Sequence, residues 1–172
     1  MKIRLEKGDI TQMSTDAIVN AANTTLLGGG GVDGAIHRAA GPELLTECKT
    51  LNGCKTGSSK ITCGYELSAK YVVHTVGPVW NGGAHNEPAL LASCYSSCLD
   101  IANQHGLKSI AFPAISTGAY QFPMKKAAQI ALHVVLEFAM TNTTLDTVVF
   151  VCFGEDSLSI YRSILKSYNE NT

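Results

Sequence analysis

Four consecutive glycines, Gly28 to Gly31, constrain this chain more than any other feature of its sequence. Glycine loses more backbone freedom on folding than any other residue, so such a run is kept where the backbone adopts a positive φ or passes close to another group. A short apolar run, Ala17–Val19, precedes the glycines, and a helical pattern from Asp33 follows them. Because the first N–H groups of a helix attract anions, this arrangement predicts a phosphate-bearing small molecule across the loop, with Asp33 beside it.

Segments typical of strands and helices alternate along the 172 residues, which we interpret as a single domain, residues 1–172. Apolar or alternating patterns predict strands at Lys2–Lys7, Ala17–Val19, Lys60–Gly64, Tyr71–Val76, Ser109–Phe112 and Thr147–Val151. Amphipathic patterns predict helices at Asp33–Ala40, Pro42–Thr50, Glu87–His105, Pro123 to about Met140, and Asp156–Tyr168. This alternation, with continuously apolar strands, predicts an α/β sandwich around a largely parallel sheet.

A second loop of small residues follows the strand that is predicted to end near Phe112. It contains Ser116, Thr117, Gly118, Ala119 and Tyr120. Ligands of parallel sheets collect at the carboxyl ends of the strands, so both loops could present backbone N–H groups to phosphate oxygens. Two neutral loops on one sheet predict one ligand with two adjacent phosphates. The alternative is that Ser-Thr-Gly is an ordinary turn and that the glycines only allow a tight path.

The spacing of Gly29, Gly31 and Gly34 matches the dinucleotide-binding pattern G-x-G-x-x-G, but its context does not fit. Several residues separate the preceding strand from the first glycine, and no acid follows at the distance expected for a ribose hydroxyl. Asp33 also lies inside the motif, where its charge would repel a pyrophosphate. No Gly-Lys-Ser/Thr occurs, so a Walker A loop is excluded as well.

Polar residues around the glycine run are candidates for chemistry, each with a simpler alternative. Asp33 could cap the helix, or its carboxylate could bind a sugar hydroxyl or orient water. His37 follows one turn later and could assist Asp33, or it could be an ordinary packed or exposed residue. Asn20 and Asn23 could form turns or hold sugar hydroxyls. His74, within an apolar strand, is expected to be buried and hydrogen-bonded.

Composition excludes several classes of protein. The net charge of −1 and the single basic pair Lys125–Lys126 argue against an extended nucleic-acid surface. No apolar run approaches the length of a membrane-spanning helix, and the first ten residues have no signal-peptide core, so we expect a cytoplasmic protein. The six cysteines lack zinc spacing and are expected to be reduced and mostly buried, with Cys94 and Cys98 on one packed helix face. We expect neither a metal nor a cofactor.

Five segments together resemble the macrodomain family. They are GDIT at Gly8–Thr11, DAIVNAAN at Asp16–Asn23, LLGGGGVDGAIHRAAGP at Leu26–Pro42, KITCGYELSAKYVVHTVGP at Lys60–Pro78 and FPAISTGAYQFP at Phe112–Pro123. More narrowly, the chain resembles the branch of O-acetyl-ADP-ribose deacetylases and mono-ADP-ribosyl-protein hydrolases. The resemblance covers essentially the whole chain in order. It implies a three-layer α/β/α sandwich over a mixed, largely parallel sheet, and it implies ADP-ribose as the ligand.

The resemblance also implies roles for individual residues at the adenine and diphosphate parts of the ligand. Asp9 would hydrogen-bond the adenine amino group, with the Ile10 backbone nearby, and Phe153 would pack against the adenine ring. The residues that would enclose the diphosphate and the distal ribose are Gly28, Gly29, Gly30, Gly31 and Val32 together with the loop Ser116–Tyr120.

At the distal ribose, the resemblance implies a catalytic pair, Asn23 and Asp33, with Asn20 supporting the loop. His37 matches a position seen in the hydrolase branch, and Tyr120 matches an aromatic residue at the distal ribose. The expected reaction is hydrolysis of an ester at this ribose, either to acetyl or to a protein Asp or Glu side chain. Asp33 or a ligand phosphate oxygen would orient the water.

Ser116 is a poor nucleophile candidate because no His–Asp pair accompanies it in the sequence. The expected partners are therefore ADP-ribose, its esters and mono-ADP-ribosylated proteins, with nucleic acid only as a modified substrate. Two alternatives remain: a reader that binds ADP-ribose without turnover, and a phosphatase acting on ADP-ribose 1″-phosphate.

Overall fold

Residues 1–141 and 144–170 are described by a computed structural model, and within them six strands form one sheet in the order β1-β6-β5-β2-β4-β3. The strands are β1 (Lys2–Lys7), β2 (Ala17–Ala22), β3 (Ser59–Cys63), β4 (Tyr71–Val76), β5 (Ser109–Phe112) and β6 (Thr147–Cys152). The helices are η1 (Ile10–Gln12, a 3-10 turn), α1 (Gly31–Ala40), α2 (Pro42–Lys49), α3 (Glu87–Gln104), α4 (Met124–Ala139) and α5 (Glu155–Glu170).

The sheet is mixed but mostly parallel. Strands β1, β6, β5, β2 and β4 are parallel to their neighbours, whereas β3 pairs with β4 in the antiparallel sense. The central strands are apolar at consecutive positions because both of their faces are covered: Ile18 packs on one side of the sheet and Val19 on the other. The edge strand β1 alternates charged and apolar residues and is partly exposed, which limits unwanted pairing at that edge.

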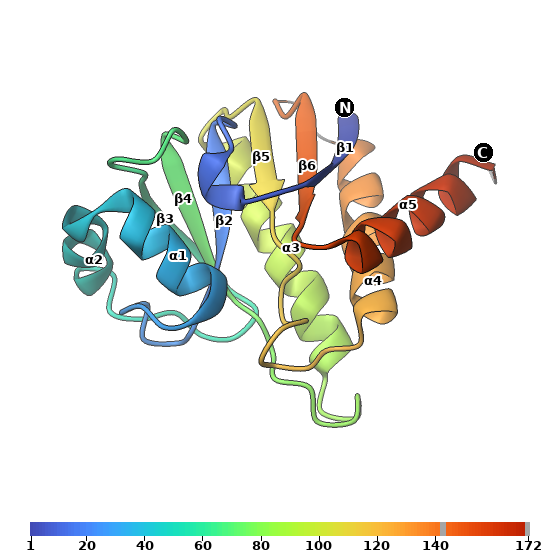
Figure 1. Cartoon of the computed structure of the whole chain (residues 1–172), viewed down its shortest axis with the longest axis horizontal. Helices are drawn as coiled ribbons and strands as arrows, with labels where there is room; N and C mark the ends of the chain where they lie inside the picture. Colours follow the sequence, from blue (N-terminus) through green and yellow to red (C-terminus); the bar gives the residue numbers. More distant parts are fainter. Residues whose placement is uncertain (142–143, 171–172) are drawn as a thin grey trace.

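Helices cover both faces of the sheet (Figure 1). On one face, α1 and α2 bury Ile36 and Leu44 against Ile18, Val72 and other side chains of the sheet. On the opposite face, α3, α4 and α5 form a larger core rich in aromatic residues around Phe112. The result is a three-layer α/β/α sandwich, as the sequence predicted.

The predicted strands and helices are all present, and many of their ends differ from the prediction by one to three residues. Two of these differences concern β2 and α4. β2 extends to Ala22, so Asn20 lies inside the strand and not in the loop after it. Pro123 is the N-cap of α4, with φ −57° and ψ 125°, and not its first helical residue as predicted. The Gly41-Pro42 pair does end one helix and begin the next, with Gly41 at φ +87°. No helix among the described residues is long and apolar enough to cross a membrane.

After β2 and after β5 the chain crosses to opposite faces of the sheet, and this divergence determines where the site lies. After β2 it passes to α1 on one face, and after β5 it passes to α4 on the other. The register pairs β2 with β5 at Ala17 with Ile110 and at Ile18 with Ala111, near the start of both strands. A parallel sheet binds ligands at the carboxyl ends of its strands where connections diverge in this way. The loops after β2, β4 and β5 lie together along this edge in Figure 1.

Candidate functional site

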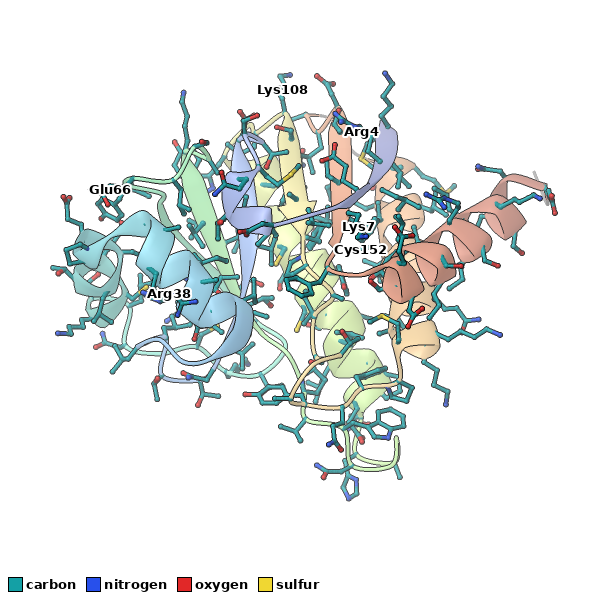
Figure 2. All side chains as sticks on the ribbon, viewed as in Figure 1. Arg4, Lys7, Arg38, Glu66, Lys108 and Cys152 are labelled. Atoms are coloured by element: carbon teal, nitrogen blue, oxygen red, sulfur yellow. The ribbon has the colours of Figure 1, made fainter. Side chains whose placement is uncertain are left out.

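The residues expected at the adenine are brought together by the pairing of β1 with β6. Lys7 and Cys152 are register partners at the ends of these strands, and their side chains lie close together in Figure 2. The Gly8 amide continues the pairing by donating to the Cys152 carbonyl, 3.0 Å away. Asp9 and Phe153 therefore follow two adjacent strands and lie at the same edge of the sheet.

Asp9 and Phe153 differ in how firmly the protein holds them. Asp9 Oδ1 accepts hydrogen bonds from the Thr11 amide (2.9 Å) and the Thr11 hydroxyl (2.7 Å), which caps η1 and fixes the carboxylate. Ile10, next in the chain, is buried. The Phe153 side chain is 92% exposed, so its ring is available to a planar ligand and contributes little to the core.

The glycine loop ends at the first turn of α1. Gly28 (φ +92°) and Gly31 (φ +57°) adopt the left-handed conformations that the run of glycines predicted. Gly30 is the N-cap of α1, and Asp33 is the third helical residue, so the alternative of Asp33 as the helix cap is wrong. Gly34 packs directly on the loop, since a Cβ there would lie 2.6 Å from the Gly29 carbonyl oxygen.

Asn23 and Asp33 converge on Gly29. A Cβ added to Gly29 would lie 3.1 Å from Asp33 Oδ2 and 3.3 Å from Asn23 Nδ2, so both polar atoms face the same point of the loop. Asn23 Nδ2 also donates to the Gly28 carbonyl (2.9 Å), which fastens the loop over the end of β2. The structure thus brings together the two residues that the family resemblance paired.

His37 lies on the same face of α1 as Asp33. Its Nε2 is 3.4 Å from Asp33 Oδ1, and its ring approaches Gly28. This Nε2 is buried and has no hydrogen-bond partner among the described residues. His37 therefore lies close to the carboxylate, as the one-turn spacing predicted.

Asn20 connects Asp33 to a buried polar chain that the sequence did not reveal. Asn20 Nδ2 lies 2.9 Å from Asp33 Oδ1 and 3.1 Å from His74 Nδ1, and His74 Nε2 lies 2.9 Å from Thr62 Oγ1. Asn20 and His74 are fully buried, as predicted for His74. Burial and the nearby His37 lower the pKa of His74 to about 3, so its ring is neutral at pH 7. This geometry supports Asn20 as a residue that holds Asp33.

The second loop is built around Ser116. This residue has φ +65° and is buried, and its hydroxyl has no hydrogen-bond partner within the described part of the chain. A Cβ on Gly77, just after β4, would lie 2.1 Å from Ser116 Oγ. Only glycine at this position therefore allows the loop after β4 to pack against Ser116. Thr117 is half-buried, with its hydroxyl bound to the Ala114 carbonyl (2.8 Å).

The rest of this loop is exposed or half-buried, and it contacts the loop after β4. Gly118 and Ala119 are exposed, and Tyr120 is half-buried. The Trp80 amide donates to the Tyr120 carbonyl (2.9 Å), and the Trp80 and Phe122 rings lie 4.8 Å apart. The loop after β4 therefore supports the loop after β5.

The cysteines of the chain are reduced and mostly buried. All six cysteines are free, and five are buried while Cys63 is exposed. Cys94 and Cys98 are fully buried on α3, as the spacing predicted. Burial, together with the charges of Glu47 and Asp33, raises the pKa of Cys48 to about 11. Among residues 1–141 and 144–170 there is no cluster of three or more His, Cys, Asp or Glu side chains that could hold a metal ion.

Comparison with known proteins identifies the family. The family model for the Macro domain matches residues 19–131. A Macro domain-containing protein of Methanosarcina mazei is 61% identical over 95% of this chain and 88% of its own length. ADP-ribose glycohydrolase MACROD2 of Xenopus laevis is 55% identical over 97% of this chain, which spans 40% of that protein.

Among solved structures, the Trypanosoma brucei macrodomain in complex with ADP-ribose superposes with a TM-score of 0.90 at 49% identity. The match covers 95% of this chain and 68% of the other. The matched residues include the glycine loop, Asn23 and Asp33, and the loop Ser116–Tyr120, all of which lie within the family model. The chain belongs to the Macro domain family.

Proposed function

We propose that this chain binds ADP-ribose along the carboxyl edge of its sheet and hydrolyses esters formed at the distal ribose. The order of the strands supports this ligand. Asp9 and Phe153 follow β1 and β6 at one end, the loop Ser116–Tyr120 follows β5, and the glycine loop follows β2. An adenine, a diphosphate and a second ribose would meet these groups in that order. The similarity to the Trypanosoma brucei macrodomain, whose structure is a complex with ADP-ribose, supports ADP-ribose as the ligand.

The observation that carries the catalytic part is the convergence of Asp33 Oδ2 and Asn23 Nδ2 on Gly29. Asn20 holds the other oxygen of Asp33, so Oδ2 faces the loop and is oriented to accept a hydrogen bond from water. Hydrolysis adds water across the ester bond and releases a ribose hydroxyl and a carboxylic acid. Asp33 Oδ2 and a ligand phosphate oxygen are the two groups that would orient this water. The similarity to a protein named ADP-ribose glycohydrolase supports a hydrolase.

The proposed substrates share one chemical feature, an acyl group esterified to the distal ribose. O-acetyl-ADP-ribose presents it as a free metabolite, and mono-ADP-ribosylated Asp or Glu side chains present it on a protein. The Asp33 side of the site lies at the open end of the glycine loop, where Gly29, Gly30 and Gly31 are exposed. A protein side chain attached to the ribose could leave the site in this direction.

The test is a panel of three substrates with the purified chain: O-acetyl-ADP-ribose, a glutamate-modified protein and ADP-ribose 1″-phosphate. We expect release of acetate and of ADP-ribose from the first two, and we expect it to persist in EDTA because the proposed reaction uses no metal. Glu43→Ala, at an exposed acid on α2, serves as the control variant. Binding without release from any substrate would identify a reader, and release of phosphate alone would identify a phosphatase.

A further inference from the structure

We propose that His74 is a positioning residue for the hydrolysis proposed above: it fixes the amide of Asn20, which in turn fixes the carboxylate of Asp33. The inference depends on that proposed function but not on the identity of the acyl group. It rests on a continuous chain of buried side chains that begins at Thr62 on β3, passes through β4 and β2, and ends at Asp33 on α1.

The fold places these side chains on one face of the sheet. Asn20 and His74 are register partners on the parallel strands β2 and β4, beneath α1. Thr62 lies on the antiparallel neighbour β3, two positions along from Lys60, the register partner of His74, and therefore on the same face of the sheet. The exposed fractions of Thr62, His74, Asn20 and Asp33 are 2%, 0%, 0% and 4%. Hydrogen bonds without competing water are strong and directional, so a buried chain of this kind can orient its last member.

Donors and acceptors along the chain fit one arrangement. The Asp33 carboxylate only accepts, so Asn20 Nδ2 donates to it, and the second Nδ2 hydrogen then points at His74 Nδ1. His74 Nδ1 must therefore carry a lone pair, and the proton of the neutral ring must sit on Nε2. Nε2 donates to Thr62 Oγ1, whose own hydrogen goes to the Cys63 carbonyl, 3.1 Å away.

This arrangement gives His74 a task that an apolar residue could not perform. An asparagine amide can turn over and exchange its oxygen for its nitrogen at little steric cost. Turned over, Asn20 Oδ1 would face two acceptors, Asp33 Oδ1 and His74 Nδ1. In this tautomer the lone pair on His74 Nδ1 adds to that of Asp33 Oδ1 in disfavouring the turned-over amide, so that Asn20 Nδ2 stays directed at the carboxylate. Asp33 Oδ2 is then directed toward Gly29.

The groups that face His74 from the packed elements are compatible with a neutral ring. Cys48 Sγ on α2 lies 3.8 Å from Nε2, and the His37 ring on α1 lies 6.5 Å away between centroids. Asp33 is separated from the imidazole by Asn20. Burial disfavours a charged His74 ring, and the nearby His37 adds to this effect.

Two matched pairs of variants test the inference through kcat. His74→Phe keeps a ring but removes both nitrogens, whereas His74→Asn returns an acceptor near the position of Nδ1. Thr62→Val removes the hydroxyl at constant shape, whereas Thr62→Ser keeps it. Loss of one positioning hydrogen bond should lower kcat by about tenfold in His74→Phe and by about threefold in Thr62→Val, with KM and ADP-ribose affinity nearly unchanged. His74→Asn and Thr62→Ser should recover most of the lost kcat.

The measurement should be made on variants whose melting curves show a folded protein, and Thr62→Val serves if His74→Phe does not fold. Equal kcat values in His74→Phe and His74→Asn, or a loss confined to KM, would overturn the inference. In the wild type at pH 7, ¹⁵N NMR should show a bare Nδ1 and a protonated Nε2 on His74. The opposite tautomer would contradict the hydrogen-bond arrangement from Thr62 to Asp33. No turnover by the wild type would instead contradict the proposed function.

Discussion

At the scale of single residues, the site depends on close contacts around Gly29. Asp33 Oδ2 and Asn23 Nδ2 lie close to the position that a Cβ would take on Gly29, so a methyl group there would push against both. Gly30, the next residue, has φ −90° and faces open space. Substitutions at these two neighbouring glycines therefore separate the effect of crowding Asn23 and Asp33, the proposed catalytic pair, from the general effect of replacing a glycine.

We predict that Gly29→Ala lowers the free energy of unfolding by about 1 kcal/mol, because the new methyl group overpacks a fitted site. It should also lower turnover by displacing Asp33 and Asn23. Gly30→Ala should change the free energy of unfolding by less than about 0.5 kcal/mol, as expected for a substitution into open space. Urea titration of both variants measures the difference. Equal destabilisation by the two substitutions would argue against the contacts described at Gly29.

His74 gives a second residue-scale prediction, in the dependence of stability on pH. The folded pKa of about 3 lies below the unfolded value of 6.5, so between these values the unfolded chain binds one more proton than the folded chain. The free energy of unfolding should therefore fall as the pH is lowered from 6.5 toward 3, with a contribution of up to about 1.4 kcal/mol per pH unit.

His74→Asn should remove this contribution and flatten the pH profile, whereas His133→Asn, at an exposed position on α4, should leave it in place. Urea titrations at several pH values between 4 and 7 measure the slopes. An unchanged slope in His74→Asn would show that the buried histidine is not responsible for it.

The sequence indicated that His74 is buried and hydrogen-bonded, but it could not indicate its partners. Asn20 lies 54 positions away along the chain, and it meets His74 only because β2 and β4 pair in register. Thr62 reaches the same ring from β3, whose antiparallel direction was not predicted. The pairing of Asp33 with His37 was predictable because it is local, with the two residues four positions apart on one helix face.

At the scale of elements, the apolar runs defined most of the architecture. β4 and β5 match their predicted ends because their residues are apolar and are bounded by turn residues. The predicted strand Ala17–Val19 was shorter than β2, because an asparagine such as Asn20 is typical of loops. Asn20 lies within the strand because its side chain belongs to the buried series of hydrogen-bonded residues. The helix beginning at Met124 was predicted one residue early, because Pro123 is equally suited to the position before a helix.

The connection between β4 and α3 is held by Glu87, which the sequence did not single out. Its buried carboxylate accepts hydrogen bonds from the amides of Asn81 (2.7 Å), Gly83 (2.9 Å) and His85 (2.5 Å). Burial would raise the pKa of Glu87, but these hydrogen bonds outweigh it and lower the pKa to about 2. The same connection supports the second loop through the Trp80–Tyr120 hydrogen bond.

We predict that Glu87→Gln increases hydrogen–deuterium exchange at the Gly83 and His85 amides, because the neutral side chain is a weaker acceptor. In the wild type, the stabilisation by Glu87 should be complete above its unfolded pKa of 4.5 and be lost as the pH falls through about 2. Glu43→Gln, at an exposed site, should leave exchange at both amides unchanged. Unaltered protection in Glu87→Gln would contradict the anchoring role.

At the scale of the whole molecule, the sheet places the residues proposed for adenine binding and those proposed for catalysis at separate positions along one edge. Phe153 follows β6, whereas Asp33 follows β2, with β5 and its loop between them. Binding and chemistry can therefore be perturbed independently. The loop positions were predicted from the rule that ligands bind at the carboxyl ends of parallel strands. Which of these loops lie next to one another could not be predicted, because that depends on the strand order, which local patterns do not contain.

Phe153→Ala should weaken ADP-ribose binding by about tenfold or more, because stacking of a base on an aromatic ring contributes about 1–3 kcal/mol. The melting temperature without ligand should hardly change, since the ring is 92% exposed. Met140→Ala, at a methionine that is 85% exposed after α4, is the matched control and should bind as the wild type does. Isothermal titration calorimetry with ADP-ribose measures both. Wild-type affinity in Phe153→Ala would place the adenine elsewhere.

The central claim is that Asp33 drives ester hydrolysis in a pocket that binds ADP-ribose by other groups. The most direct test compares the wild type with Asp33→Ala in release of ADP-ribose from a glutamate-modified protein, with ADP-ribose affinity measured in parallel. Losses for essential catalytic groups are large, so kcat should fall by about 100-fold or more while ADP-ribose still binds. Turnover by Asp33→Ala at the wild-type rate would contradict the account.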